Sequence, residues 1–348
     1  MTTPTPGRVR LSVLDLAPVA SGSTSAQALR NSLDLARHVE RLGYYRYWVA
    51  EHHNMPGIAS SAPAVLIGHI ADATSTIRVG SGGVMLPNHA PLVIAEQFGM
   101  LEAFHPGRID LGIGRAPGTD PLTASALRGT AELNADSFPN ELAYLLAFFN
   151  GDFPPEHPYA RITPVPARGN APAMWLLGSS DYSAQVAAYL GIPFAFAHHF
   201  APENTLAAVA TYRSLFRPSK DLQEPYTLVA AAVVCSDTDE RARWLAQPSA
   251  LSFLRLRSGS PGQLPTPEEA AAYLYSEAEQ AFIDKRQKHQ IIGSPETVSR
   301  GLAELREQTQ ADELMLTTVV HNHADRLRSY ELVSGSTYAQ SGNRSVRT

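Results

Sequence analysis

The sequence predicts a single α/β domain, 1–348, folded as a closed barrel of eight parallel strands, a (β/α)8 barrel. Three observations support this prediction. Short, continuously apolar segments alternate with helical segments along nearly the whole chain, eight strand segments can be counted, and 348 residues suit one large barrel. Continuous apolar strands separated by helices indicate parallel strands that are buried on both faces. An open, doubly wound sheet of eight strands is the alternative.

The strand segments can be located from their runs of apolar and β-branched residues. The first helix follows the Ser/Thr-rich stretch 21–25, carries leucines on roughly one face and ends at Gly43. The expected strands are 8–17, 45–50, 77–86, 109–113, 174–177, 194–197, 226–235 and 313–320. The other expected helices are 64–73, 92–104, 120–149, 183–190, 201–216 and 324–333.

Two segments interrupt this alternation as insertions after strands four and seven. The first, 151–170, is rich in proline and is expected to be irregular or to contain short β structure. The second, 247–280, contains a Ser/Gly/Pro-rich centre at 258–262. Long loops in compact domains are usually lids or binding loops, so we expect a mobile cover over the active site. The polar tail 335–348 is expected to be flexible.

Composition and charge exclude several classes of protein. A net charge of -5 and a pI of about 6.2 provide no basic stripe for nucleic acid. The apolar runs are far shorter than the ~20 residues that span a membrane, and no secretion signal is recognised. The single cysteine, Cys235, lies in an apolar run and is expected to be a buried thiol. These features predict a soluble cytoplasmic protein.

Titratable and amide side chains follow the second strand at once, as Glu51, His52, His53 and Asn54. The carboxyl ends of parallel strands are where ligands bind in such folds. Adjacent residues on a strand point to opposite faces, so only one of the two histidines can face the barrel axis. Because a histidine titrates near neutral pH, that residue is a candidate proton carrier.

Glycines mark the ends of the third and fourth strands, at Gly82-Gly83 and at Gly114, which precedes Arg115. Glycine within a strand commonly marks a bulge or a flat ligand against the backbone, and arginine suits a phosphate. Neither segment is a dinucleotide-binding fingerprint, because Met85 and Pro117 occupy the third glycine position.

Hydroxyl and imidazole side chains follow strands five, six and eight. Gly178, Ser179 and Ser180 lead into a helix that contains Ser183, which indicates either an anion site or ordinary N-capping. Strand six ends at His198 and His199. Strand eight is followed by His321 and His323, which suggest a metal, but no H-E-x-x-H pattern or carboxylate cluster accompanies them. No metal site is therefore predicted.

The segments 50–53, 79–87, 107–115 and 178–180, taken together, resemble the bacterial luciferase-like flavin monooxygenases, specifically their single-component, alkanal-monooxygenase-like branch. The likeness extends from about Arg8 to Val333. It implies a TIM barrel that binds reduced FMN at its carboxyl-terminal face. It further implies that O2 is used to oxygenate a small apolar organic substrate such as an aldehyde.

The resemblance also assigns roles to individual residues. His52 matches the catalytic histidine, Gly82-Gly83 match a non-proline cis peptide beneath the flavin ring, and Arg115 matches the arginine that grips the phosphate. Gly114 stands where light-emitting members carry a cysteine, so light emission is not expected. The remaining implied contacts are Gly178, Ser179, Ser180 and Ser183 at the phosphate, His198 at the ring, and Glu51, His53 and Asn54 around the substrate pocket.

Two partners are expected. The chain has no recognised nicotinamide motif, so a separate flavin reductase would supply reduced FMN. Members of the family pair through their early helices, which implies a homodimer through 64–73 and 92–104. The alternatives are a deazaflavin (F420)-dependent hydride-transfer oxidoreductase of the same fold, a non-catalytic flavin-binding barrel, and a metal-dependent barrel hydrolase that uses His321 and His323. The sequence does not name the substrate.

Overall fold

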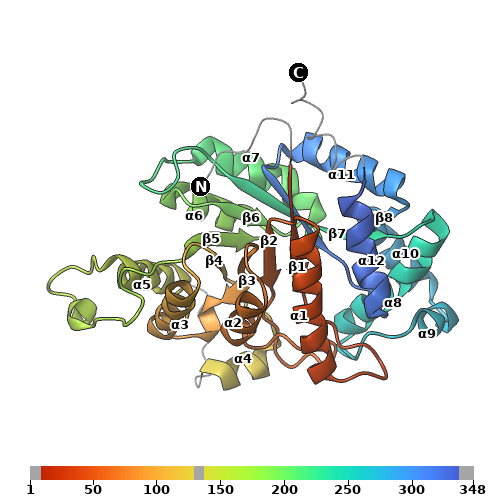
Figure 1. Cartoon of the computed structure of the whole chain (residues 1–348), viewed down its shortest axis with the longest axis horizontal. Helices are drawn as coiled ribbons and strands as arrows, with labels where there is room; N and C mark the ends of the chain where they lie inside the picture. The colour runs from red at the N-terminus through yellow and green to blue at the C-terminus, as the bar shows by residue number, and fades with distance from the viewer. Residues whose placement is uncertain (1–8, 129–136, 337–348) are drawn as a thin grey trace.

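A closed, eight-stranded parallel barrel surrounded by helices forms the centre of the protein, a TIM barrel as predicted (Figure 1). The computed structural model describes residues 9–128 and 137–336. Strand β1 pairs with β2 and β9, and the pairing continues through β6, β7 and back to β9, so the ring has no free edge. The barrel strands are β1 (Arg10–Asp15), β2 (Arg46–Val49), β3 (Arg78–Met85), β4 (Ile109–Gly114), β5 (Ala173–Gly178), β6 (Phe194–Phe196), β7 (Thr227–Cys235) and β9 (Glu313–Thr317).

A short additional strand, β8 (Ile291–Gly293), pairs with the last residues of β7 outside the ring. The sequence analysis did not predict it, because a three-residue strand carries too little periodicity to recognise.

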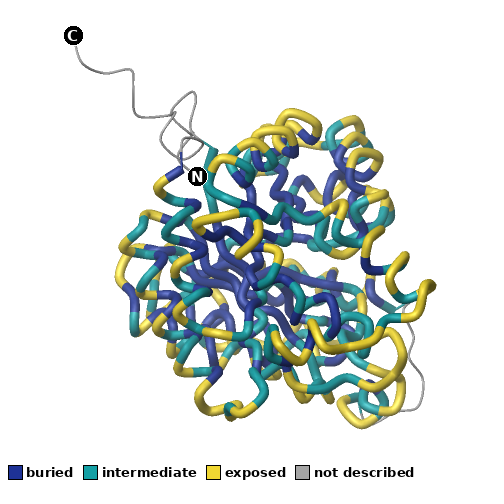
Figure 2. Tube along the Cα trace, turned by 90° about the vertical axis from the view of Figure 1, so that its right-hand side faces the viewer, coloured by how far each residue is buried: buried dark blue, intermediate teal, exposed yellow. Residues whose placement is uncertain are grey.

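The helices form an outer layer around the barrel, and the buried segments gather in the middle of the molecule (Figure 2). Helix α1 begins at a Thr24 N-cap, whose side chain accepts a hydrogen bond from the backbone of Gln27. The helices are α1 (Ser25–Arg41), α2 (Pro63–Ala73), α3 (Pro91–Phe104), α4 (Pro121–Arg128), α5 (Phe138–Asn150), α6 (Asp181–Leu190), α7 (Thr205–Leu215), α8 (Asp239–Arg257), α9 (Pro267–Ala272), α10 (Glu277–Gln287), α11 (Pro295–Thr309) and α12 (His323–Ser334).

The segment 247–280 is largely helical, which corrects the expectation of a long irregular loop. Helix α8 runs through Pro248 to Arg257, and α9 and the start of α10 follow. Capping boxes at Thr266 and Ser276 begin these two helices, so the local signals for helix initiation were present in the sequence. Pro248 lies inside α8, which packs against β7 and β8.

Three other segments can be compared with their expectations. The helix expected over 120–149 is described as α4 and α5, and 129–136 lie outside the described residues. The insertion 151–170 contains a 3-10 turn, Pro158–Arg161, and no strand among its residues, all of which are described. Most of the tail 335–348 lies outside the described residues.

A buried ion-pair network closes the amino-terminal end of the barrel interior. Arg46 lies 3.0 Å from Glu313 and 2.7 Å from Asp110, and all three side chains are fully buried. Burial raises the pKa of Asp110, but the positive charges of Arg46 and Arg78 outweigh burial, and the net effect lowers the pKa. The interior above this network is filled by Leu14, Trp48, Trp175, Leu228 and Met315. Only the carboxyl-terminal end is therefore available for a ligand.

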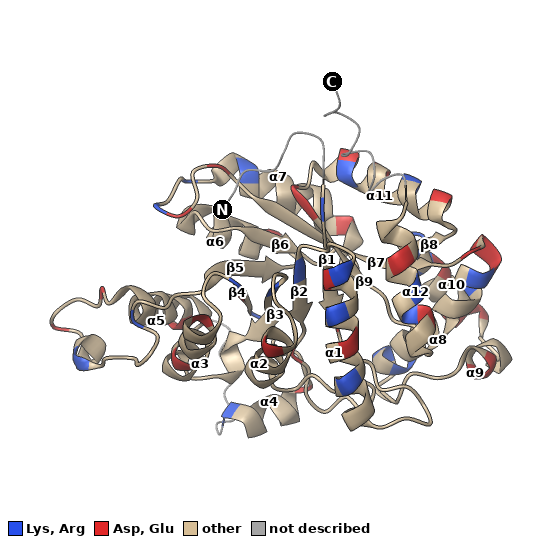
Figure 3. Cartoon of the chain, in the orientation of Figure 1, with Lys and Arg blue, Asp and Glu red and all other residues tan. Residues whose placement is uncertain are grey.

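The surface carries both signs of charge. Lysine and arginine side chains alternate with aspartate and glutamate over the outer helices (Figure 3). Within the described part of the chain, no helix has the length and apolar character needed to cross a membrane.

Candidate active site

Glu51 is the centre of a hydrogen-bond cluster at the carboxyl end of β2. The side chain is fully buried, and its Oε1 accepts hydrogen bonds from Nε2 of His53 at 2.9 Å and Nε2 of His89 at 2.8 Å. Its Oε2 accepts from the backbone of Met85 at 3.0 Å. Burial raises the pKa of Glu51, but the hydrogen bonds from His89 and His53 outweigh burial and lower the pKa overall.

His52 points away from this cluster, in agreement with the alternation expected for a strand. Its Nδ1 lies 3.2 Å from the carbonyl oxygen of Gly118. A carbonyl can only accept, so Nδ1 carries the hydrogen and Nε2 is the free acceptor. Burial lowers the pKa of His52 and outweighs the raising effects of Gly118 and Glu51. His52 is therefore neutral at neutral pH, with an unprotonated Nε2.

Asn54 connects the β2 loop to the start of α4. It has a positive φ of 54°, a conformation that asparagine tolerates better than most residues. Its Nδ2 donates to Asp120 at 3.0 Å, and Asp120 also accepts from Thr123. The side chain of Asn54 thus fixes the loop that follows the two histidines.

Glycines allow β3 and β4 to approach each other closely at the site. The Gly82–Gly83 peptide bond is cis, as the resemblance implied, and the pairing register shifts between Gly82 and Val84, which is a bulge. A Cβ on Gly83 would lie 2.8 Å from the carbonyl oxygen of Gly112. The space beside Gly114 is taken by Met85, because a Cβ there would lie 2.9 Å from the Met85 sulfur.

Arg115 and the N-terminus of α6 form a site with the chemistry of an anion receptor. The guanidinium carbon of Arg115 lies 4.3 Å from the ring centroid of Tyr182, the second residue of α6. Ser180 is the N-cap of this helix, and its side chain makes no capping hydrogen bond. No ion pair of the Arg115 side chain occurs among the described residues. These donors fit the phosphate of FMN.

Gly178, Ser179 and Ser183 complete the connection from β5 to α6. Ser183 is buried, and a Cβ on Gly178 would collide with it, so glycine is required there for packing. The carbonyl oxygen of Ser179 accepts a hydrogen bond from Asn204 at 3.2 Å, and the residue is partly exposed.

Two neighbouring histidines after β6 take different positions. Nδ1 of His198 lies 2.8 Å from the Thr205 hydroxyl. His199 lines the two cavities at the carboxyl ends of the strands, and its Nδ1 lies 3.1 Å from the carbonyl oxygen of Ala230. Burial lowers the pKa of His199 to about 4, and the charges of Arg286 and His52 act in the same direction.

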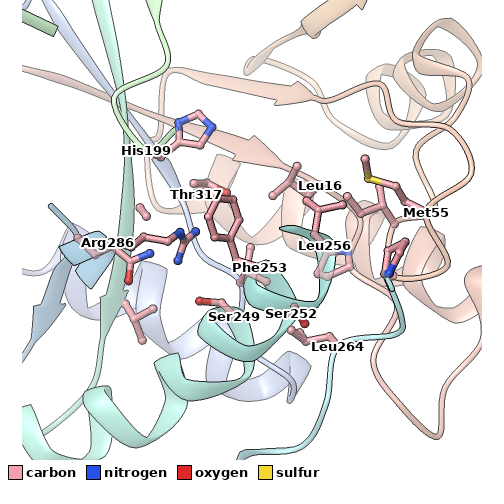
Figure 4. A pocket seen from close by; sticks show the side chains of 18 of the residues that line it. Leu16, Met55, His199, Ser249, Ser252, Phe253, Leu256, Leu264, Arg286 and Thr317 are labelled. Atoms are coloured by element: carbon pink, nitrogen blue, oxygen red, sulfur yellow. The ribbon is translucent and has the colours of Figure 1, made fainter. Parts of the chain in front are cut away.

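The larger cavity has a volume of about 190 Å³ and lies between the ends of β1, β7 and β9 and the inner faces of α8 and α10 (Figure 4). Its walls are mostly apolar, and its polar members are His199, Ser249, Ser252, Arg286, Gln290 and Thr317. A smaller cavity of about 40 Å³ extends into the barrel mouth beside Gly82, Trp48 and Leu177. His199 borders both, so the glycine-lined mouth and the apolar cavity meet at this residue.

The sequence analysis noted His199 without giving it a role, and it missed His89 and Arg286 as site residues. His89 follows the third strand and His199 follows His198, so position at a strand end was an available signal for both. Arg286 had no such signal, because it lies on α10, far from any barrel strand in sequence.

The other histidines and the cysteine considered in the sequence lie in separate environments. His321 contacts the backbone oxygen of Ser21 at 3.2 Å, and His323 pairs with Asp34 at 2.9 Å. Cys235 is a buried free thiol whose pKa burial raises to about 12. Over residues 9–128 and 137–336, no group of three or more histidine, cysteine, aspartate or glutamate side chains could hold a metal ion.

The open end of this parallel barrel combines an anion receptor, glycine-lined strands and an apolar cavity, which are the features of a TIM barrel suited to a phosphate-bearing cofactor. The family model of the luciferase-like monooxygenases matches residues 9–313, and the chain belongs to this family. A luciferase-like monooxygenase of Escherichia coli K12 is 47% identical over 93% of this chain and 96% of its own length. The N-acetyl-S-alkylcysteine monooxygenase of Bacillus subtilis is 34% identical over 95% of this chain and 99% of its own length.

Solved structures share the fold. The crystal structure of apo-MsnO8 is 39% identical, with a TM-score of 0.87, over 96% of this chain and 99% of that chain. The FMN complex of the oxygenating constituent of 3,6-diketocamphane monooxygenase from Pseudomonas putida shares the fold at 18% identity, a TM-score of 0.70 and coverages of 96% and 98%. An F420-dependent secondary alcohol dehydrogenase also shares the fold, at 13% identity and a TM-score of 0.67, over 94% of this chain and 98% of that chain.

Proposed function

We propose that the protein is an FMN-dependent monooxygenase that uses reduced FMN and O2 to oxygenate a small apolar organic substrate. One observation carries the proposal: an anion receptor and an apolar cavity of about 190 Å³ share one end of the barrel. Such a combination suits a phosphate-bearing cofactor beside an apolar substrate. Reduced FMN would supply the electrons that activate O2.

The residues of the chain have distinct roles in this proposal. Arg115 and the N-terminal amides of α6 bind the phosphate, with Ser179 and Ser180 as hydroxyl donors. Nε2 of His52 is the proton acceptor, because Nδ1 is committed to the carbonyl of Gly118. The Glu51 cluster fixes the backbone on which His52 is mounted. The apolar walls exclude water from the reacting atoms.

The proposal includes a separate flavin reductase and a homodimer in the cytoplasm. A reductase is required because no nicotinamide motif is recognised in the sequence. Support for the dimer comes from α2 and α3, whose outer surface exposes Val65, Met100 and Phe104, the last with 74% of its surface accessible. Exposed apolar side chains grouped on neighbouring helices are typical of an interface.

Hydride transfer with a deazaflavin is the second candidate, and the fold shared with the F420-dependent dehydrogenase favours considering it. The anion receptor at Arg115 suits the phosphate of either cofactor. The two candidates differ in the fate of oxygen, because only the monooxygenase incorporates an atom of O2 into the product.

The test is turnover of photoreduced FMN and 18O2 with aldehydes and thioethers of increasing chain length. We expect oxygen consumption that depends on the organic substrate, and one 18O atom in the product. Product without 18O, or turnover only with reduced deazaflavin, contradicts the proposal. A non-catalytic flavin-binding barrel would bind FMN and give no product with any substrate, whether His52 is present or replaced by alanine.

A further inference from the structure

An arginine without an anionic partner among the described residues points into the larger cavity. Arg286 lies in the last turn of α10, and Figure 4 shows the guanidinium end of its side chain directed into the cavity. The guanidinium carbon lies 4.2 Å from the ring centroid of Phe253. Its Nη1 is buried and has no hydrogen-bond partner, and no carboxylate pairs with the side chain within 9–128 or 137–336.

Such a position is unfavourable for an unliganded arginine. Burial lowers the pKa of Arg286 to about 10, so the side chain still carries its charge at neutral pH. A buried charge without a partner is strongly destabilising, and pairing with an anion offsets much of that cost. The titratable side chain with which Arg286 interacts electrostatically is His199, which offers no negative charge. The compensating group is therefore absent from the described protein residues.

The cavity around Arg286 has two chemically different parts. Ser252 lines it next to Phe253, and the hydroxyl of Ser252 also lacks a hydrogen-bond partner. Further polar side chains in the wall are His199, Ser249, Gln290 and Thr317, and most of the remaining wall is apolar, from Leu16, Ile58, Val233, Leu256, Leu264 and Ile292 among others. At roughly 10–15 Å³ for each water-sized group, about 190 Å³ holds on the order of a dozen non-hydrogen atoms.

We propose that this cavity binds a substrate with an apolar body and a single anionic head group, a carboxylate or its chemical equivalent, held by Arg286 and Ser252. A guanidinium binds a carboxylate through charge-assisted hydrogen bonds, and the Ser252 hydroxyl donates a further one. The catalytic consequence rests on the proposed function above, but the binding does not, because the head-group site is complete without a cofactor.

The anion is not the phosphate of the flavin. The phosphate receptor of Arg115 and α6 belongs to β4 and β5, whereas the Arg286 cavity belongs to β1, β7 and β9. These strands lie on opposite sides of the ring, given the pairing order β4-β5-β6-β7-β9-β1. One molecule of FMN cannot place its single phosphate in both sites, so the Arg286 site is left for the substrate.

The experiment compares an apolar carboxylate with an uncharged analogue of the same chain length. Octanoate and methyl octanoate are titrated into the full-length protein by calorimetry, in the presence and absence of FMN. The variants are Arg286→Met, Arg286→Lys and, as a control with the same loss of charge, Arg257→Met at the exposed end of α8. Thermal melting of each variant reports folding.

We expect the wild-type protein to bind octanoate at least about tenfold more tightly than the ester, the ratio that a hydrogen bond to a charged group provides. Arg286→Met should lose this preference while it remains folded, Arg286→Lys should retain part of it, and Arg257→Met should retain all of it. An unchanged preference in Arg286→Met, or no saturable binding of octanoate, overturns the proposal. The proposal is also overturned if Arg286→Met binds FMN more weakly but still prefers octanoate to the ester. That result would mean that Arg286 contacts the cofactor.

The same titrations separate this inference from the proposed function. If the oxygenation assay fails but octanoate binding depends on Arg286, the head-group site is correct and the reaction is not. If oxygenation proceeds but charged and uncharged substrates are used equally by wild type and Arg286→Met, the reaction is correct and the head-group site is not.

Discussion

Nε2 of His89 donates a hydrogen bond of 2.8 Å to Oε1 of Glu51, which joins the end of β2 to the segment after β3. The two residues are 38 positions apart in sequence, and the carboxylate between them is fully buried. The same oxygen accepts from His53. The backbone that presents His52 is therefore held by one buried carboxylate, and the stability of the site should depend on its ionisation.

Replacement of Glu51 by glutamine should destabilise the protein by about 1–3 kcal/mol, because buried donors lose part of their acceptor. The pKa of the carboxyl is lower in the folded state than its ordinary value of 4.5. Its contribution is therefore present above the unfolded pKa and is lost as the pH falls through the folded pKa. Urea unfolding at pH 7 and at pH 4 or below should show a stability difference between wild type and variant that shrinks in acid. A difference that grows in acid contradicts this assignment.

Replacement of His52 by alanine should lower kcat/KM by about 10²–10⁴-fold while FMN binding is retained, because positioned proton transfer contributes on that order. Burial lowers the pKa of His52 below its ordinary 6.5, so the base is neutral and active at neutral pH. Activity should fall on the acid side with a midpoint below 6.5. His38→Ala serves as a control, since this residue of α1 pairs with Glu331 of α12 in the outer layer of helices. Equal losses in the two variants would argue against His52 as the base.

The barrel and much of the site could be predicted because they depend on local patterns. Three of these patterns involve neighbouring residues, and the structure agrees with each. They are the apolar strands, the glycines at strand ends, and the opposite orientation of His52 relative to Glu51 and His53. The partners of Glu51 and the unpaired charge of Arg286 depend on tertiary packing. No local pattern indicates that a residue on α10 faces the ends of β7 and β9, so these parts of the site required coordinates.

Replacement of Arg115 by methionine should weaken FMN binding about 10- to 100-fold, the value of a charge-assisted hydrogen bond to phosphate. Riboflavin, which lacks the phosphate, provides the control ligand, and its affinity should not change. Arg115→Lys should recover part of the loss, because lysine keeps the positive charge but lacks the planar, bidentate donors of the guanidinium. The measurement is fluorescence quenching of each flavin on titration. An equal loss for FMN and riboflavin would mean that Arg115 supports the pocket instead of the phosphate.

Alanine substitutions at Gly83 and Gly114 should differ in their effect on stability. A Cβ at position 83 would lie 2.8 Å from a backbone oxygen of β4, which cannot move away, so we expect a loss of about 1–3 kcal/mol. At position 114 the obstacle is the sulfur of Met85, at the flexible end of a side chain, and the loss should be about 1 kcal/mol or less. Thermal unfolding of the two variants checks the order. A larger loss at position 114 would contradict the packing described at the site.

Replacement of Phe104 by glutamate should shift the protein from dimer to monomer if α2 and α3 form the subunit interface. Phe104 exposes 74% of its surface at the end of α3, and a charge introduced there would be buried without a partner on association. Leu274→Glu is the matched control, because Leu274 is 94% exposed between α9 and α10, away from these helices. Sedimentation velocity should give a dimer for wild type and for Leu274→Glu, and a monomer for Phe104→Glu. A dimer that survives in Phe104→Glu and dissociates in Leu274→Glu would place the interface on the side of the Arg286 cavity.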